Sequence, residues 1–266
     1  MNARAPQSLE ILSELPESPR ATPLLFVHGA HAGAWCWEQH FLPYFAKAGY
    51  ACYAVSLSGH GESPGHNYLD ALSIDDYVRD VREAVATLPA PPVVIGHSMG
   101  GFVLQKCLEV AELPGAVLLC SVPPLGMMAP AVGLALRRPG LVMDLGRLAG
   151  GGQIGTNSLV DAMFYRALPE ADLRRYFEHM QSESQRAIWD MMGFNLPRIR
   201  RDHCPKVLVM GAEEDALIPS VAVRHTAFAW GVEPHLVPGI GHGVMLETNW
   251  QDIAEPLRDW LLEHFA

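Results

Sequence analysis

The sequence has no run of about 18 apolar residues, the length that a membrane-spanning helix requires. Residues 1–20 also contain no apolar stretch suited to a signal peptide, so we expect a cytoplasmic protein without a membrane span. Positive charge is scarce: 19 Lys and Arg against 29 Asp and Glu leave a net charge of −10. Because phosphate binding relies on clustered positive charge, we expect no nucleic-acid partner.

Cysteine is also rare, with five residues and no C-x-x-C pair. An odd number without close spacing argues against a disulfide framework. We therefore expect buried free thiols at Cys36, Cys52, Cys107, Cys120 and Cys204.

Apolar residues, by contrast, are abundant, at 49% of 266 residues. This is enough for one globular domain with a large core, or for such a domain with an insertion. Short runs that are apolar throughout are typical of strands in a parallel sheet that is covered on both faces. Six such runs occur, at 23–29, 50–57, 91–97, 115–122, 206–212 and 234–239.

Amphipathic segments alternate with these runs. Ser73 is suited to cap a helix that follows it, and Asp75 and Asp76 favour the positive end of the helix dipole. Residues 101–113 and 250–265 predict further helices, the second interrupted early by Pro256. The alternation predicts an α/β protein with a doubly wound, mostly parallel sheet.

Residues 123–197 break the alternation, because they contain helical patterns but no convincing strand. We interpret them as a helical lid, or cap, inserted into a core made of residues 1–122 and 198–266, with a flexible stretch at 149–155.

The motif "GHSMGG", residues 96–101, joins a predicted strand to a predicted helix. G-x-S-x-G in this context is the nucleophile-elbow pattern, which exposes the Ser98 hydroxyl above the strand end. The glycines let strand and helix approach closely, and the same glycines alone would fit simple packing equally well. The turn also aims the N–H of Met99 beside the serine, at a helix N-terminus.

A serine hydroxyl needs a base, and the base needs an acid that orients it. Asp215 and His242 each follow a later predicted strand, in the order Ser, Asp, His that accompanies this elbow. We predict Asp215 as the acid, with Glu214 as the alternative, and His242 as the base.

Attack on a carbonyl also requires donors for the developing oxyanion. We predict Met99 N–H as one donor and Ala30 N–H, in the loop "HGAHAGAW", as the other, with the His28 ring bracing that loop. A metal site is conceivable but lacks carboxylate or cysteine partners at ligand spacing, so we predict no metal and no cofactor. Its candidate ligands are His28, His31, His60 and His66.

Together the motifs "HGAHAGAW", "SLSGHGESP", "GHSMGG", "GAEEDALIP" and "GIGHGVMLE" resemble the α/β-hydrolase fold superfamily over nearly the whole chain. "HGAHAGAWCW" is similar to the plant esterase and hydroxynitrile lyase branch. The lyases of that branch carry threonine and lysine where this chain has Gly29 and Gly243, so the resemblance disfavours lyase chemistry. Two opening antiparallel strands are usual in the family, whereas only "SLEILSEL" is available here, so we expect a shortened hairpin.

These features predict a serine hydrolase that cleaves an ester, thioester or lactone of a small, largely apolar substrate. The alternatives are non-hydrolytic chemistry on the same scaffold (a lyase, an acyltransferase or a cofactor-free oxygenase) and a small-molecule-binding module without turnover. Seven of the eleven methionines lie in residues 123–197 and suit either an adaptable apolar roof or ordinary packing. We predict substrate contacts from Gly29, His31, Trp35, Met127, Met128 and Trp189.

Overall fold

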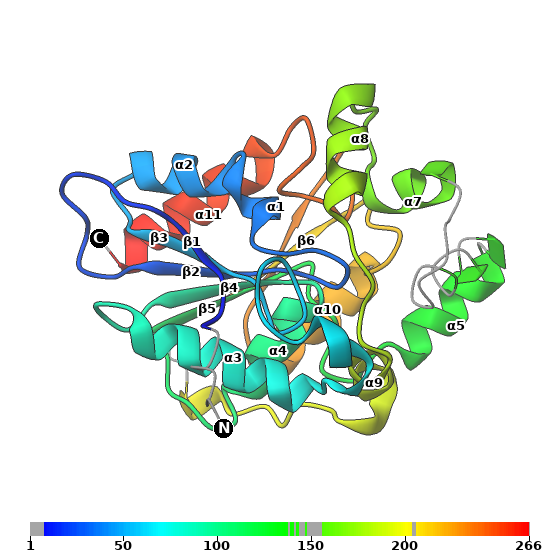
Figure 1. Ribbon diagram of the computed structural model, residues 1–266, viewed down its shortest axis with the longest axis horizontal. Helices are drawn as coiled ribbons and strands as arrows, with labels where there is room; N and C mark the ends of the chain where they lie inside the picture. The colour runs from blue at the N-terminus through cyan, green and yellow to red at the C-terminus, as the bar shows by residue number, and fades with distance from the viewer. Residues whose placement is uncertain are drawn as a thin grey trace, which may run out of the picture.

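The computed structural model of the protein describes residues 8–137, 139–140, 142–143, 147, 156–203 and 206–265. Seven strands form one sheet in the order β1-β3-β2-β4-β5-β6-β7 (Figure 1). Every neighbouring pair is parallel except β1 and β3, so the predicted α/β class is confirmed. The strands are β1 Ile11–Glu14, β2 Leu24–Val27, β3 Cys52–Val55, β4 Val93–His97, β5 Gly115–Leu119, β6 Val207–Ala212 and β7 Pro234–Val237.

The predicted strands at 23–29, 50–57, 91–97, 115–122, 206–212 and 234–239 contain β2 to β7 in that order. In the described residues before β2 (8–23), only β1 forms a strand, and it pairs with β3 rather than with a hairpin partner. In this part of the chain the segment "SLEILSEL" contributes a single antiparallel edge strand.

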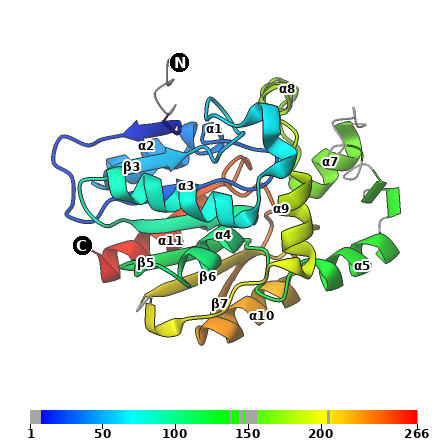
Figure 2. The ribbon, with the colours of Figure 1, turned by 60° about the horizontal axis from the view of Figure 1, so that its bottom comes forward.

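Helices cover both faces of the sheet (Figures 1 and 2). One face carries α1 Trp35–Glu38, α2 Phe41–Lys47 and α11 Gln251–His264; the other carries α3 Ile74–Thr87, α4 Met99–Cys107 and α10 Ser220–Trp230. The expected interruption at Pro256 is wrong, because α11 is continuous through that residue. Burial of Ile253, Leu257 and Leu261, at about 1.5–3 kcal/mol each, outweighs the roughly 3 kcal/mol that an interior proline costs.

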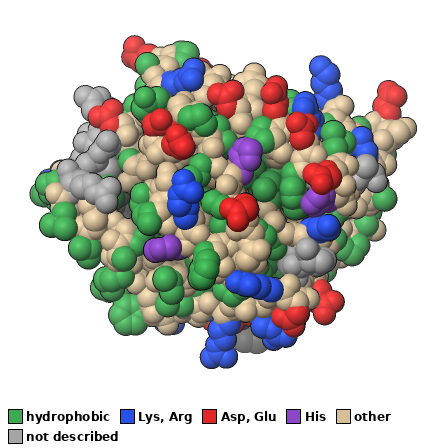
Figure 3. All heavy atoms as spheres, turned by 180° about the vertical axis from the view of Figure 1, so that it is seen from behind, with side chains coloured by type: hydrophobic (Ala, Val, Ile, Leu, Met, Phe, Trp, Pro, Cys, Tyr) green, Lys and Arg blue, Asp and Glu red, His purple; other side chains and the backbone are tan. Residues whose placement is uncertain are grey.

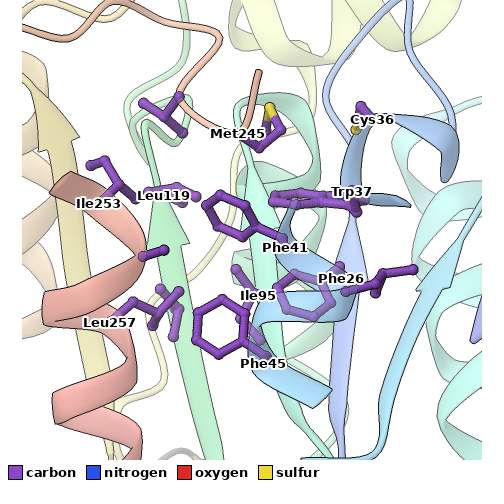
Figure 4. Packing of buried hydrophobic residues seen from close by; sticks show 14 of the residues in the cluster. Phe26, Cys36, Trp37, Phe41, Phe45, Ile95, Leu119, Met245, Ile253 and Leu257 are labelled. Atoms are coloured by element: carbon purple, nitrogen blue, oxygen red, sulfur yellow. The ribbon is translucent and has the colours of Figure 1, made fainter. Parts of the chain in front are cut away.

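The apolar runs fill both layers between sheet and helices. Successive side chains of a strand point to opposite faces, so Phe26 packs with the α1, α2 and α11 side while Leu25 packs with the α3, α4 and α10 side. Figure 4 shows the first layer, in which the Phe26 ring lies among the aromatic rings of Trp37, Phe41 and Phe45. Burial on both faces explains why the inner strands β2, β4 and β5 contain no polar alternation.

The described part of residues 123–197 contains helices and no strand. The helices are α5 Met128–Arg137, α7 Thr156–Met163, α8 Glu170–His179, α9 Gln185–Trp189 and a π-helical turn at Asp190–Phe194. Short 3-10 turns occur elsewhere at His66–Ala71 and Arg201–His203. The stretch 149–155 that the sequence indicated as flexible lies outside the described residues.

No helix in the described ranges is long and apolar enough to cross a membrane. Cys36, Cys52, Cys107 and Cys120 are buried free thiols, while Cys204 lies outside the described residues. On the face seen in Figure 3, Lys and Arg side chains are scattered among acidic and apolar ones rather than gathered into a patch.

Candidate active site

Ser98 lies at a sharp turn between β4 and α4, with φ 52° and ψ −115°. This left-handed backbone is strained for a residue with a side chain. Close packing holds it, because a Cβ at Gly100 would lie 2.5 Å from the carbonyl oxygens of Val27 and His28. The structure therefore brings the predicted elbow to the carboxyl end of the central strand, with Ser98 at its tip.

His242 and Asp215 meet Ser98 from two separate loops. The Nε2 atom of His242 lies 3.0 Å from the Ser98 hydroxyl, and its Nδ1 atom lies 2.7 Å from Oδ2 of Asp215. The other carboxylate oxygen of Asp215 accepts the N–H groups of Leu217 and Ile218, each at 2.8 Å. The buried carboxylate is thus fixed on both oxygens and oriented toward the imidazole.

Glu214, the alternative acid, contacts different groups. Its carboxylate accepts the N–H of Gly239 at 2.7 Å and that of Ile240 at 3.3 Å. These amides belong to the loop that leads to His242, so Glu214 holds that loop rather than the His242 ring itself.

Two side chains that the sequence did not single out flank this chain of hydrogen bonds. His97 donates from Nε2 to the carbonyl of His242 at 2.9 Å, and burial holds the pKa of His97 well below its usual range. Cys120, with φ 45°, is fully buried; burial and the nearby Asp215 carboxylate raise the pKa of its thiol. His97 adjoins Ser98 in the quoted motif, but nothing in the sequence pairs it with His242.

The loop after β2 brings Ala30 beside the serine. Leu57 N–H donates to Nε2 of His28 at 3.0 Å, so the ring proton is on Nδ1 and is donated to the Gly29 carbonyl at 2.7 Å. Burial lowers the pKa of His28 to about 3, which keeps this ring neutral. In a trans peptide the N–H of Ala30 points opposite to the Gly29 carbonyl, away from His28. Within the described part of the chain, the N–H groups of Ala30 and Met99 have no protein acceptor.

A cavity of about 100 Å³ opens at the serine. Of the predicted contacts, Gly29, His31 and Trp35 line it, together with Ala30, Ser98 and His242. Most of the remaining wall is apolar, and residues 123–197 supply much of it through Leu159, Met163, Phe164, Tyr176, Phe177 and Met180.

Three predicted contacts lie away from this cavity, and they correct the sequence-based assignment. Met127 packs against the α3, α4 and α10 layer and donates its N–H to the carbonyl of Met191. Met128 is half exposed. Trp189 is exposed, and its ring contacts that of Phe194. The sequence could not show which part of a helical insertion faces the serine, because helix periodicity alone does not fix where each helix packs.

The histidines considered as metal ligands bind protein atoms instead. Both ring nitrogens of His28 and of His60 contact protein partners, and His66 contacts the Gly61 carbonyl. Among the described residues, His97, Cys120 and His242 do place ligand atoms within 4.8 Å of one another. A metal there would compete with Ser98 and Asp215 for the ring nitrogens of His242.

Comparison with known proteins gives a consistent picture. Residues 24–255 match the sequence profile of the Alpha/beta hydrolase family. Monoacylglycerol lipase of Mycolicibacterium smegmatis is 25% identical, covering 94% of this chain and 91% of the lipase. Methylesterase 3 of Arabidopsis thaliana is 29% identical over 98 residues, so that the match spans only 37% of that plant relative.

Solved structures share the fold at low identity. The esterase EaEST of Exiguobacterium antarcticum superposes with a TM-score of 0.72 at 18% identity, covering 96% of this chain and 98% of the esterase. A bromoperoxidase of Bacillus anthracis gives 0.71 at 19% identity, with 96% of each chain covered. The same backbone thus carries differently named activities.

Proposed function

The chain belongs to the alpha/beta hydrolase family, and from this premise we propose that it is a serine hydrolase that cleaves small, largely apolar carboxylic esters, thioesters or lactones. The observation that carries the proposal is the continuous hydrogen-bonded path from Ser98 through His242 to Asp215, at 3.0 and 2.7 Å. At its Ser98 end this path opens into a cavity whose walls are mostly apolar.

In the proposed reaction His242 takes the Ser98 proton while Oγ attacks the substrate carbonyl. The tetrahedral intermediate collapses to an acyl-enzyme as His242 protonates the leaving alcohol. Water, deprotonated by His242, then attacks the acyl-enzyme and releases the acid. Asp215 stays ionised throughout and stabilises the imidazolium cation.

The N–H groups of Ala30 and Met99 are the proposed oxyanion donors. Support comes from their lack of protein acceptors in the described chain and from the His28 contact that directs the Ala30 N–H. Because such donors bind a developing oxyanion more strongly than a neutral carbonyl, they stabilise the transition state more than the substrate.

The cavity size favours a short acyl group. At about 100 Å³ it is smaller than the roughly 150 Å³ cavity that takes up benzene in a protein core. We therefore propose acyl chains of about four carbons or fewer, with Leu159 and Met163 limiting longer ones.

The packing around Gly29 and Gly243 argues against lyase chemistry. A Cβ at Gly29 would lie 2.9 Å from Nδ1 of His97, and one at Gly243 would lie 2.7 Å from the Phe164 ring. The threonine and lysine of the lyases would therefore not fit at these positions without rearrangement.

Residues 123–197 are proposed to act as the lid, because their side chains form much of the cavity wall. A cytoplasmic location is proposed from the four described cysteines, which are buried thiols and form no disulfide with one another.

Replacing Ser98 with alanine tests the proposal. We expect S98A to lose at least about 10³-fold in kcat on p-nitrophenyl butyrate, because the covalent step disappears. A fluorophosphonate should add one equivalent to the wild-type protein at Ser98 and none to the variant, as read by mass spectrometry.

The control is S18A, since Ser18 is exposed at a bend and lies outside the cavity lining. Near-wild-type turnover in a folded S98A protein would rule out the acyl-enzyme route.

A further inference from the structure

A second buried polar cluster, not used in the reaction above, lies behind the loop that carries Ala30. Its centre is the fully buried carboxylate of Glu183, which belongs to residues 123–197 and precedes α9. Oε1 accepts the Tyr77 hydroxyl at 2.8 Å and the Ser184 N–H at 2.7 Å. Oε2 contacts His60 Nε2 at 3.0 Å and accepts the His31 N–H at 3.3 Å.

The hydrogen bonds identify this contact as an ion pair. Nδ1 of His60 contacts the Ser58 carbonyl at 3.1 Å, and a carbonyl can only accept. Nε2 contacts a carboxylate that already accepts three other donors, so both ring nitrogens carry protons. The nearby Glu183 and Asp80 carboxylates raise the pKa of His60 against the effect of burial, and His60 in turn lowers the pKa of Glu183 to about 2.

The pair reaches the predicted oxyanion loop directly. His31 has φ 64°, a strained conformation for a residue with a side chain. Its N–H is bound by Glu183, its ring Nδ1 contacts the Gln181 carbonyl at 3.0 Å, and its own carbonyl accepts the Gln181 N–H at 3.1 Å. The segment 181–183 therefore clamps His31 through backbone and side chain.

Ala30 lies between two fixed peptide planes as a result. His28 holds the carbonyl of the peptide before Ala30, and Glu183 holds the N–H of the peptide after it. We propose that the buried Glu183–His60 pair positions the Ala30 oxyanion donor, so that a residue of the helical insertion completes the catalytic loop. The expected effect on kcat rests on the proposed function, whereas the expected effect on the backbone of residues 29–33 does not.

The test compares E183Q with E178Q, the same substitution at an exposed glutamate of α8. Glutamine keeps the size of the side chain but removes the charge and replaces one acceptor oxygen by a donor. We expect kcat of E183Q on p-nitrophenyl butyrate to fall about 10- to 100-fold with KM changed by less than about threefold, because a misdirected oxyanion donor weakens the transition state selectively. E178Q should retain wild-type values.

A readout independent of activity is amide hydrogen exchange in residues 29–33. Exchange there should be at least about tenfold faster in E183Q than in E178Q, because the His31 N–H loses a charged acceptor. A double-mutant cycle combines E183Q with H60Q. The kcat of the double variant should be no lower than that of E183Q alone, since the two residues act as a unit. Equal exchange and equal kcat in E183Q and E178Q would overturn the proposal.

If the wild-type protein hydrolyses none of the esters, the proposed function fails, and the exchange comparison still decides the positioning role. If E183Q does not fold, the wild-type His60 ring is titrated by NMR. A doubly protonated ring at about pH 7 supports the ion pair, and a neutral ring there refutes it.

Discussion

Glu214 and Asp215 are neighbours in sequence, but their carboxylates bind different groups. Asp215 orients the His242 ring, whereas Glu214 accepts two amides of the loop that precedes His242. The difference arises because Asp215 follows the turn after β6, where its side chain is buried and accepts the N–H groups of Leu217 and Ile218. Two adjacent acids can thus divide the work of orienting a base and of holding its backbone.

Replacing the two acids separately distinguishes these roles. D215N should lower kcat by about 10³- to 10⁴-fold, because an amide no longer stabilises the imidazolium and favours the wrong tautomer. E214Q should lower it by less than about tenfold while costing about 1–2 kcal/mol of stability through weakened amide contacts. Ester turnover and urea unfolding of both variants measure this. An equal loss of kcat in the two variants would contradict the assignment.

The start of helix α3 is fixed by a local sequence pattern, the Ser73 cap with Asp76 three residues later. Ser73 accepts the N–H of Asp76, and Asp76 accepts the N–H of Ser73, which completes a capping box. The helix then places Tyr77 where its hydroxyl reaches Glu183. A short cap therefore fixes the start of an element that also supports the buried ion pair.

Removing the cap should weaken folding more than catalysis. S73A should lower the free energy of unfolding by about 1 kcal/mol and Tm by about 2–4 °C, because the N–H of Asp76 loses its side-chain acceptor. Ester turnover should stay within about twofold, since the rest of α3 stays packed. The matched control is S18A at an exposed bend, which should leave Tm unchanged. If kcat fell by more than the loss of folded protein explains, α3 would act on the site directly.

For the molecule as a whole, the sheet, the elbow and the order of Ser98, Asp215 and His242 were accessible from sequence because each depends on a short local pattern. Apolar runs fix strands, and a glycine-flanked serine fixes a turn. The Glu183–His60 contact was not accessible, since the partners are 123 positions apart and neither has a local signature. The misplacement of Met127, Met128 and Trp189 has the same origin: where inserted helices pack is decided by tertiary contacts.

Two buried histidines also make the whole fold sensitive to acid. His28 and His97 have lowered pKa values, chiefly because burial disfavours the cation, so they stay neutral when folded and take up protons when unfolded below about pH 6.5. Burial also lowers the pKa of the partly exposed His31, which acts in the same direction. The free energy of unfolding should therefore fall by about 2–3 kcal/mol between about pH 7 and pH 5.5. His60 offsets part of this, because its raised pKa stabilises the fold more as pH falls.

Urea denaturation across this pH range measures the effect, and H225Q, at an exposed position on α10, should leave the slope unchanged. Stability that stays constant or rises on acidification in a H60Q background, where the opposite contribution of His60 is absent, would mean that His28 and His97 accept protons in the folded protein. That outcome would also remove the tautomer argument for a neutral His28, which supports Ala30 as a proposed oxyanion donor.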